Sequence, residues 1–259
     1  MKKFGLTTNS KMCLGKKLFQ IKALISFGNV EKGDLGGFIE KEDNLSQSGN
    51  AWVYGNAEVY GNAWVYGNAE VSGNAEVSGN AEVSGNAEVY GNARVSGNAW
   101  VYGNAEVYGN AWVYGNAEVS GNAEVSGNAE VSGNAEVYGN ARVSGNAWVY
   151  GNAEVYGNAW VYGNAEVSGN ARVSGNARVS GDAEVSGNAD YTTIKGFGRN
   201  CRNTTFFKSE DGDVKVVCGC FYGTLDKFRK KVKETHGDSK YATEYLAIAD
   251  LMELHFKED

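Results

Sequence analysis

Several features that are common in other protein classes are missing from this 259-residue sequence. It has no proline, only four cysteines and two histidines, and no run of about 18 uninterrupted apolar residues that a membrane helix would need. Its start carries early lysines but no apolar stretch of signal-peptide length. Four cysteines in a chain this long do not indicate a disulfide framework. These absences argue against a membrane protein and predict a reducing, cytoplasmic setting.

Glycine is abundant, with 36 residues, but frequent valine and aromatic residues and the lack of proline argue against a disordered linker. The net charge of −7 is unevenly distributed. Residues 1–48 carry eight Lys or Arg against five Asp or Glu, residues 49–190 carry four against fifteen, and residues 191–259 carry twelve against eleven. The acidic central part favours solubility and argues against nucleic-acid binding along its length.

Most of the chain is a six-residue repeat of the form G-N-A-x-V-y, which recurs 24 times between Gly49 and Gly187. Within A-x-V-y the small or aliphatic residues alternate with variable ones, which predicts a short strand with Ala and Val inward and x and y outward. Gly and Asn readily take the positive φ that a tight corner demands. Each unit therefore predicts one strand and one corner.

A single unit of this kind is not stable alone, because burial of one valine returns less free energy than the ordering of six residues costs. Backbone ladders and valine packing between successive units must supply the rest. The repeat therefore predicts an all-β solenoid.

The pattern V-y-G-N-A-x resembles the hexapeptide-repeat superfamily, which includes the hexapeptide transferases. The resemblance implies a left-handed parallel β-helix with three hexapeptides in each triangular coil. The 24 units would then form about eight 18-residue coils, a rod of about 38 Å. A flat, two-sided solenoid with 12-residue coils is the structural alternative.

The variable positions follow a 48-residue block, WY, EY, WY, ES, ES, ES, EY, RS, which does not divide evenly into 18-residue coils. The expected faces therefore pair Trp52 with Trp160, Trp112 with Trp148, and Trp64 with Trp100. Six Trp and eleven Tyr are expected to point outward without forming a continuous stripe on any face. Our interpretation is that whole blocks were duplicated and that the three faces are equivalent. The same register stacks four carboxylates, Glu70, Glu88, Glu106 and Glu124.

The two ends differ from the rod, so we divide the chain into residues 1–48, 49–190 and 191–259. In the first part, KKLFQIKALISFG predicts a strand or hairpin, and Asp43-Asn44, six residues before Gly49-Asn50, predicts a degraded first coil. This part is expected to be a β cap over the end of the solenoid.

The last part predicts a small α+β domain of ββαα order. A hairpin is expected to turn at Asp211-Gly212. Thr224 is expected to cap a helix that buries Leu225, Phe228 and Val232 and ends near Gly237. A second helix, over about 239–256, is expected to bury Tyr241, Tyr245, Ile248 and Met252.

GDLGGFIEKEDNLSQSGNAWVYGNA and the tail around CGCF, GTLDKF and THGD resemble phage- and prophage-encoded hexapeptide proteins described as polymer-forming. Enzymes of the wider superfamily are trimeric acyltransferases with a catalytic histidine in the coils. Here His236 and His255 both lie in the C-terminal part, and no loop interrupts the 24 units. The acyltransferase role is therefore not carried over, and we expect no enzyme and no cofactor.

Cysteines and a basic run are the remaining candidates for chemistry or binding. Cys218 and Cys220, with Cys201 and His236, lack the usual spacing of zinc ligands, so free thiols are the preferred interpretation. Lysines 227, 230 and 231 belong to a basic run that is either a solvated helix face or a contact for an acidic partner. The candidate interaction surface comprises Trp52, Trp64, Trp100, Trp112, Trp148, Trp160, Tyr102, Tyr108, Tyr150, Tyr156, Lys227, Lys230 and Lys231.

The first functional hypothesis is a non-enzymatic, phage-type spacer that presents the C-terminal domain for recognition and self-associates, with a trimer as the family expectation. The alternative is an oligomeric protein that sequesters a small metabolite or a host factor. An acidic mimic of nucleic acid and an acyltransferase come last.

Overall fold

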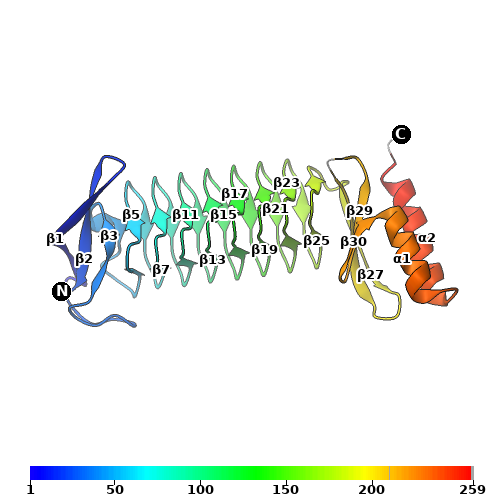
Figure 1. Ribbon diagram of the computed structural model, residues 1–259. Coiled ribbons are helices and arrows are strands. Elements are labelled where there is room, and N and C mark those ends of the chain that lie inside the picture. Colours follow the sequence, from blue (N-terminus) through cyan, green and yellow to red (C-terminus); the bar gives the residue numbers. More distant parts are fainter. Residues whose placement is uncertain (210, 258–259) are drawn as a thin grey trace.

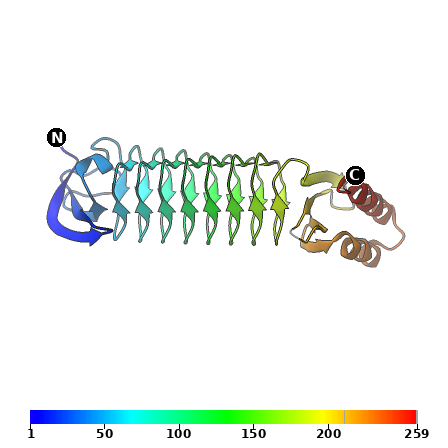
Figure 2. The same ribbon diagram turned by 90° about the horizontal axis from the view of Figure 1, so that it is seen from above.

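The computed structural model describes residues 1–209 and 211–257. The chain forms a straight rod of stacked coils, with a group of strands at its N-terminal end and an antiparallel sheet with two helices at its C-terminal end (Figures 1 and 2). This architecture confirms the predicted β-solenoid with a strand-rich cap and a C-terminal α+β domain. No helix among the described residues is long and apolar enough to cross a membrane.

The rod consists of three parallel sheets, and each turn of the chain adds one two-residue strand to every sheet. Paired residues lie 18 positions apart in the sequence, as Glu70 with Glu88 and Val71 with Val89. The register confirms the 18-residue coil and excludes the alternative with 12-residue coils. Since the sheets hold seven or eight of these short strands each, the rod has about eight turns.

Each of these strands covers the x and V positions of one hexapeptide. The first sheet contains β4 (Trp52–Val53), β7 (Glu70–Val71), β10 (Glu88–Val89), β13 (Glu106–Val107), β16 (Glu124–Val125), β19 (Arg142–Val143), β22 (Trp160–Val161) and β25 (Arg178–Val179). The second contains β6 (Trp64–Val65), β9 (Glu82–Val83), β12 (Trp100–Val101), β15 (Glu118–Val119), β18 (Glu136–Val137), β21 (Glu154–Val155) and β24 (Arg172–Val173). The third contains β5 (Glu58–Val59), β8 (Glu76–Val77), β11 (Arg94–Val95), β14 (Trp112–Val113), β17 (Glu130–Val131), β20 (Trp148–Val149), β23 (Glu166–Val167) and β26 (Glu184–Val185).

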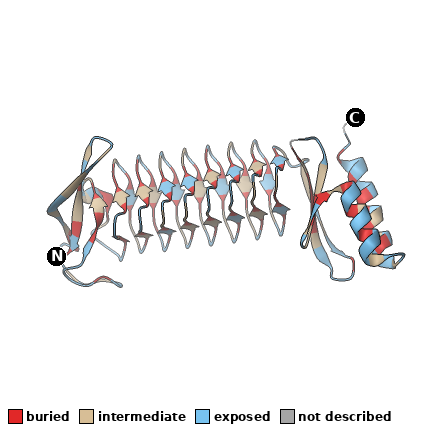
Figure 3. Cartoon of the chain, in the orientation of Figure 1, coloured by how far each residue is buried: buried red, intermediate tan, exposed pale blue. Residues whose placement is uncertain are grey.

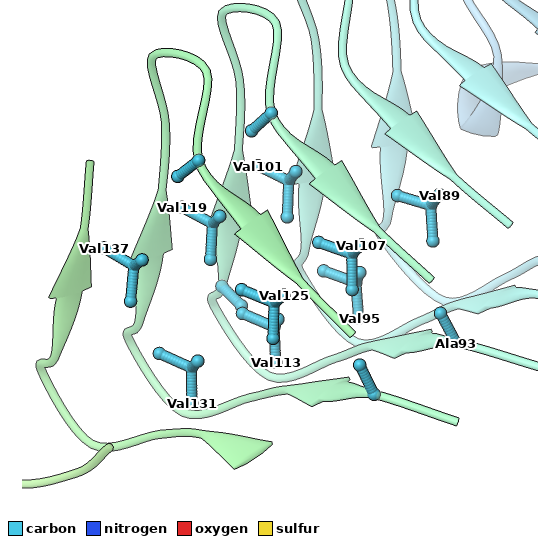
Figure 4. Close-up of a cluster of buried hydrophobic side chains, with 14 of the residues drawn as sticks. Val89, Ala93, Val95, Val101, Val107, Val113, Val119, Val125, Val131 and Val137 are labelled. Carbon is cyan, nitrogen blue, oxygen red and sulfur yellow. The ribbon is translucent and has the colours of Figure 1, made fainter. Parts of the chain in front are cut away.

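The core of the rod is a continuous column of alanine and valine. Every repeat Ala and Val from Ala51 to Val185 is at most 1% exposed. Figure 4 shows the valines of the three sheets pointing toward one another, for example Val107, Val113 and Val101. The alternation A-x-V-y therefore places its apolar half inside, as predicted.

Each corner combines a glycine with an asparagine, and both interact with the next coil. Gly115 has a φ of 75°, and a Cβ built on it would lie 3.0 Å from the backbone N and O of Gly133. Only glycine combines this backbone conformation with so close a contact. Asn98 donates from its side-chain Nδ2 to Oδ1 of Asn116 at 2.9 Å, one rung of a ladder that recurs every 18 residues.

The N-terminal cap is built from β1 (Phe4–Cys13), β2 (Lys16–Ala23), β3 (Leu35–Ile39) and the short 3-10 helix η1 (Glu42–Asn44). The strands β1, β2 and β3 pair antiparallel in that order, and β3 then pairs in parallel with β5 of the rod. The cap therefore continues the third sheet of the solenoid and covers its first coil.

The degraded first coil is confirmed, but its predicted phase is wrong. Phe38 pairs with Glu58 and Leu45 with Val65, so the offset is twenty residues rather than eighteen. Asn44 consequently does not occupy a Gly-Asn corner. Its side chain is buried and donates to the backbone O of Ala63 at 2.8 Å. The cause is an insertion of two residues in the turn after Leu45, which spacing alone does not locate.

The C-terminal domain contains β27 (Tyr191–Phe197), β28 (Arg202–Lys208), β29 (Val214–Cys218), β30 (Phe221–Thr224), α1 (Leu225–His236) and α2 (Lys240–His255). The four strands pair antiparallel in chain order. The predicted ββαα order is therefore corrected to ββββαα, although the hairpin around Asp211 and Gly212 is confirmed between β28 and β29. The two missed strands are short or rich in polar residues, so their apolar pattern was weak.

The first helix agrees with its prediction, since Thr224 caps it and Leu225, Phe228 and Val232 are buried. In the second helix Tyr245, Ile248 and Met252 are buried as expected. Tyr241 is 37% exposed, and its burial was a wrong prediction. The helix is turned so that Ala242 and Ala249 occupy the buried face instead.

Strand β28 joins the domain to the rod. Its Phe207 packs with the core of the solenoid, while the preceding residue, Phe206, packs with the two helices on the other face of the sheet. Thr205 Oγ1 accepts a hydrogen bond from the backbone N of Arg178 at 3.0 Å, and Asn203 Nδ2 donates to the backbone O of Asn176 at 2.8 Å. The sheet therefore seals the last coil, and Figure 3 shows buried positions on this sheet and on both helices.

Candidate functional site

The C-terminal domain lies at the end of the rod (Figure 1). It holds a cavity of about 240 Å³ between its sheet and helix α1. Its side chains come from the loop between β27 and β28 and the start of β28, from the β29–β30 turn and the strand ends beside it, and from both helices. The cavity is lined by Arg199, Asn200, Arg202, Cys218, Cys220, Phe221, Phe228, Lys231, Val232, Thr235, His236 and Tyr245.

The charged side chains that line this cavity are of one sign, although Glu244 and Glu234 lie nearby. Arg199, Arg202 and Lys231 line it together with His236, and no Asp or Glu does. Within residues 1–209 and 211–257, neither Arg199 nor Arg202 has a carboxylate oxygen within 4.0 Å. Lys231 is 3.8 Å from Glu234, and both side chains are more than half exposed. The cavity therefore presents positive charge that the described part of the protein leaves largely uncompensated.

The interior wall is aromatic. Phe228 packs against Phe221 with ring centroids 5.5 Å apart and edge-on against Tyr245 at 5.7 Å. The Tyr245 hydroxyl donates to the backbone O of Phe197 at 3.3 Å. Burial, and then the neighbouring Cys218 thiol, raise the pKa of Tyr245 to about 12. Tyr245 therefore remains a neutral, fixed ring at physiological pH.

The cysteines take different places. Cys218 and Cys220 line the cavity beside His236, whereas Cys201 does not. Cys218 is half-buried and accepts a hydrogen bond from Thr204 Oγ1, and Cys201 and Cys220 are exposed. In the described parts of the chain, no three or more His, Cys, Asp or Glu residues form a group able to hold a metal ion. Three of the four side chains considered for zinc, Cys218, Cys220 and His236, therefore line one cavity without forming such a group.

The three candidate lysines of the basic run lie on α1 but do not share a site. Lys231 lines the cavity, Lys227 faces a separate hollow near Tyr222 at the junction with the rod, and Lys230 is exposed. Arg199 and Arg202 were missed from sequence. In the sequence they belong to the run Gly-Arg-Asn-Cys-Arg, which is typical of a polar loop. Only the fold shows that this run lies over the cavity.

The candidate tryptophans of the rod lie on the predicted faces, since their strands belong pairwise to the same three sheets. Trp64, Trp100, Trp112 and Trp148 are exposed by 38–42%, and Trp160 is half-buried. Trp52 does not point into solvent as predicted. It is 1% exposed because Phe4 and Phe27 of the cap pack edge-on against it, at 6.2 and 5.4 Å. It belongs to the core and not to an interaction surface.

The candidate tyrosines are half-buried and bonded along the rod. Tyr102, Tyr108 and Tyr150 donate to Glu118, Glu124 and Glu166 at 3.2–3.4 Å, in each case sixteen residues further on. Tyr156 stacks on Tyr138 with ring centroids 5.0 Å apart. These side chains make contacts between coils, and the hydroxyl groups of Tyr102, Tyr108 and Tyr150 are already hydrogen-bonded within the rod.

The tryptophans also make hydrogen bonds to residues sixteen positions away in the sequence. Trp112, Trp148 and Trp160 donate from Nε1 to Ser96, Ser132 and Ser144 of the preceding coil at 3.1–3.4 Å. Trp100 has the same spacing from Ser84. No Tyr of the repeat lies sixteen residues before a Trp. These Ser–Trp pairs recur at intervals of 48 residues, so the contacts between coils are repeated with the block, and block duplication stays a prediction.

A family profile described as the YdcK beta-solenoid repeat matches six stretches of the rod, residues 87–103, 99–115, 135–151, 147–163, 165–181 and 171–187. No curated protein matches the chain. The matched stretches cover strands of all three sheets and stop short of both ends. The chain is therefore a β-solenoid repeat protein whose coils are similar to those of the YdcK repeat.

Proposed function

We propose that this protein is a non-enzymatic spacer, a rigid β-solenoid that holds its C-terminal domain as a recognition domain at a set distance from the N-terminal cap. The observation that carries the proposal is the continuity of the buried core. Alanine and valine fill the rod without interruption, and Phe207 extends the same core into the sheet of the C-terminal domain. A domain joined in this way moves with the rod rather than on a flexible linker.

Further support comes from the position of the cavity. It lies beyond the last coil, where a partner can reach it, while the sides of the rod carry Tyr–Glu and Ser–Trp pairs between coils. The phage or prophage origin and the cytoplasmic setting implied by the sequence belong to the same proposal.

The proposal is tested by shortening the rod. Deletion of residues 103–120 removes one coil, and deletion of 103–138 removes two. Both shortened proteins keep the native contact pattern between coils. Each Tyr of the repeat is still followed, sixteen residues later, by Glu or Arg and never by Trp. Spin labels at Lys22→Cys and Lys195→Cys, with the four native cysteines replaced by serine, report the distance between the ends.

We expect narrow distance distributions that shorten by about 5 Å and about 10 Å, because parallel strands are spaced by about 4.8 Å. A broad distribution in the full-length protein, or a distance that does not follow the number of coils, would refute the spacer.

Self-association is a second proposal, favoured by the exposed edges of Trp100, Trp112 and Trp148. Light scattering distinguishes a monomer of 27.7 kDa from the trimer of the family expectation. A trimer that gains thermal stability from heated cell extract would favour the sequestering function over the spacer. A monomer in both conditions would exclude binding clefts between rods.

A further inference from the structure

We propose that the cavity of the C-terminal domain binds a small anionic molecule that carries one planar ring. This inference rests on the proposed role of the domain in recognition and names the chemical class of its ligand.

The charge of the ligand follows from the lining. Two guanidinium groups and one ammonium group surround the cavity, and no carboxylate lines it. A guanidinium group presents a planar fork of donors that fits a carboxylate or phosphate, and such charge-assisted hydrogen bonds are the strong ones. An anion at this position would supply the counter-charge that the described residues do not give to Arg199 and Arg202.

The planar ring of the proposed ligand is inferred from the apolar wall of the cavity and from the cavity volume. Phe221, Phe228, Val232 and Tyr245 form an apolar surface on which a planar ring can pack face or edge. A volume of about 240 Å³ admits a molecule of one ring with its anionic group, and is below the usual range of about 300–1,000 Å³ for larger ligands.

Two glycines show that the backbone is built around the lining side chains. A Cβ on Gly219 would lie 2.3 Å from an Nη atom of Arg202, and a Cβ on Gly198 would lie 2.2 Å from the Tyr245 hydroxyl oxygen. Both glycines have positive φ, at 64° and 71°. A Cβ on Gly198 would displace the Tyr245 ring, whereas the exposed end of the Arg202 side chain can move aside from a Cβ on Gly219, where the positive φ itself favours glycine.

The test uses the full-length protein and isothermal titration calorimetry with three probes: phenyl phosphate, benzoate and the neutral benzyl alcohol. The variant is Arg202→Met, which keeps an unbranched side chain over Gly219. The matched control is Lys230→Met, which removes one positive charge from an exposed site on α1 outside the cavity. Arg202→Lys tests rescue by charge, and the melting temperature of each variant checks its folding.

We expect both anions to bind wild type and Lys230→Met alike and to bind at least about tenfold more weakly to Arg202→Met. Benzyl alcohol should bind at least about tenfold more weakly than phenyl phosphate to wild type, and Arg202→Lys should recover part of the loss. Equal binding of the neutral probe, an equal loss in Lys230→Met, or no binding of either anion at 10 mM would overturn the inference. Deletion of one coil should leave these affinities unchanged, so failure of the spacer and failure of the ligand class are separate results.

Discussion

Glycine at the corner of a hexapeptide has two separate roles. It adopts a positive φ, and it leaves room for the backbone of the next coil. At one position of the rod only the first role applies. Gly115 and Gly175 both have positive φ, at 75° and 68°. A Cβ on Gly115 would press on the backbone of Gly133, whereas a Cβ on Gly175 would meet no atom within 4 Å. The pair therefore separates the strain of the backbone conformation from the closeness of the next coil.

We expect Gly175→Ala to lower the free energy of unfolding by about 1–2 kcal/mol, the cost of a left-handed conformation for a residue with a Cβ. Gly115→Ala should cost more than this, because the neighbouring backbone must also move. Urea unfolding followed by circular dichroism measures both variants. Equal losses would mean that the spacing between coils adjusts freely.

The variable residues carry information about the coil that follows them. Ser132 is 5% exposed beneath Trp148, whereas Ser126 is half-buried beneath Arg142. Tyrosine beneath arginine already occurs in the protein, at Tyr156 before Arg172 and at Tyr162 before Arg178.

Ser132→Tyr is therefore expected to reduce the unfolding free energy by about 1–3 kcal/mol, because it removes the Trp148 hydrogen bond and overpacks the site. Ser126→Tyr is its control and should change stability by less than about 0.5 kcal/mol. Thermal melts of the two variants give the comparison. A tolerated Ser132→Tyr would show that the absence of Tyr–Trp pairs reflects the history of the repeat and not packing.

At the scale of elements, the same sequence, Trp-Val-Tyr, has different environments at the end and in the middle of the rod. Trp52 lies beneath the cap, in space left by Gly36, while Trp112 lies on an open face and is 38% exposed. The cap thus turns a surface residue of the repeat into a core residue.

Trp52→Ala should destabilise the protein by about 3–5 kcal/mol, as expected for a large aromatic removed from a core. Trp112→Ala should cost about 1 kcal/mol or less, since this side chain lies on an open face, where it contacts Tyr114, Arg94 and Ser96. Guanidinium unfolding of the two variants would decide. A similar effect of both substitutions would contradict a structural role of the cap around Trp52.

For the whole molecule, the stacked carboxylates make stability depend on pH and salt. Glu70, Glu88, Glu106 and Glu124 pair in register, and each adjacent pair at about 5 Å costs about 0.8 kcal/mol in water. Burial and the charge of Glu88 raise the pKa of Glu70. A raised carboxyl pKa means that the folded state binds protons more readily than the unfolded state, so stability falls as pH rises through this range.

The melting temperature should therefore increase from pH 7 to pH 5, and also on addition of salt at pH 7. Two other groups make stability rise with pH, but they act outside the range from pH 5 to pH 7. The pKa of Asp211, held at about 2 by Lys215, matters only below its ordinary value of 3.8. The pKa of Lys3, lowered to about 8 by burial, makes stability rise only between about pH 8 and 10.5.

Glu88→Gln, at the centre of the ladder, should raise the melting temperature at pH 7 and weaken its pH dependence. Glu31→Gln removes the same charge from an exposed site of the cap and should do neither. Calorimetry at pH 5 and pH 7 tests both variants. If the two behaved alike, the effect would come from net charge and not from stacking.

The sequence by itself determined the solenoid, its 18-residue register through the resemblance, the inward Ala and Val, and helix α1 with its Thr224 cap. These features are local or periodic, so one unit predicts all the others. The hand of the coil remains a prediction, because it was implied by the resemblance alone.

Only the tertiary structure decided that variable residues sixteen positions apart meet, that Trp52 is buried, and that Arg199 and Arg202 lie over the same cavity as Lys231. It also decided the two-residue insertion in the first coil and the four strands of the C-terminal sheet. Each of these features depends on contacts between residues far apart in the chain, such as Phe4 with Trp52 or Phe207 with the last coil. A repeating pattern determines its own period, but the ends of a stack and the contacts made across it depend on which surfaces pack together.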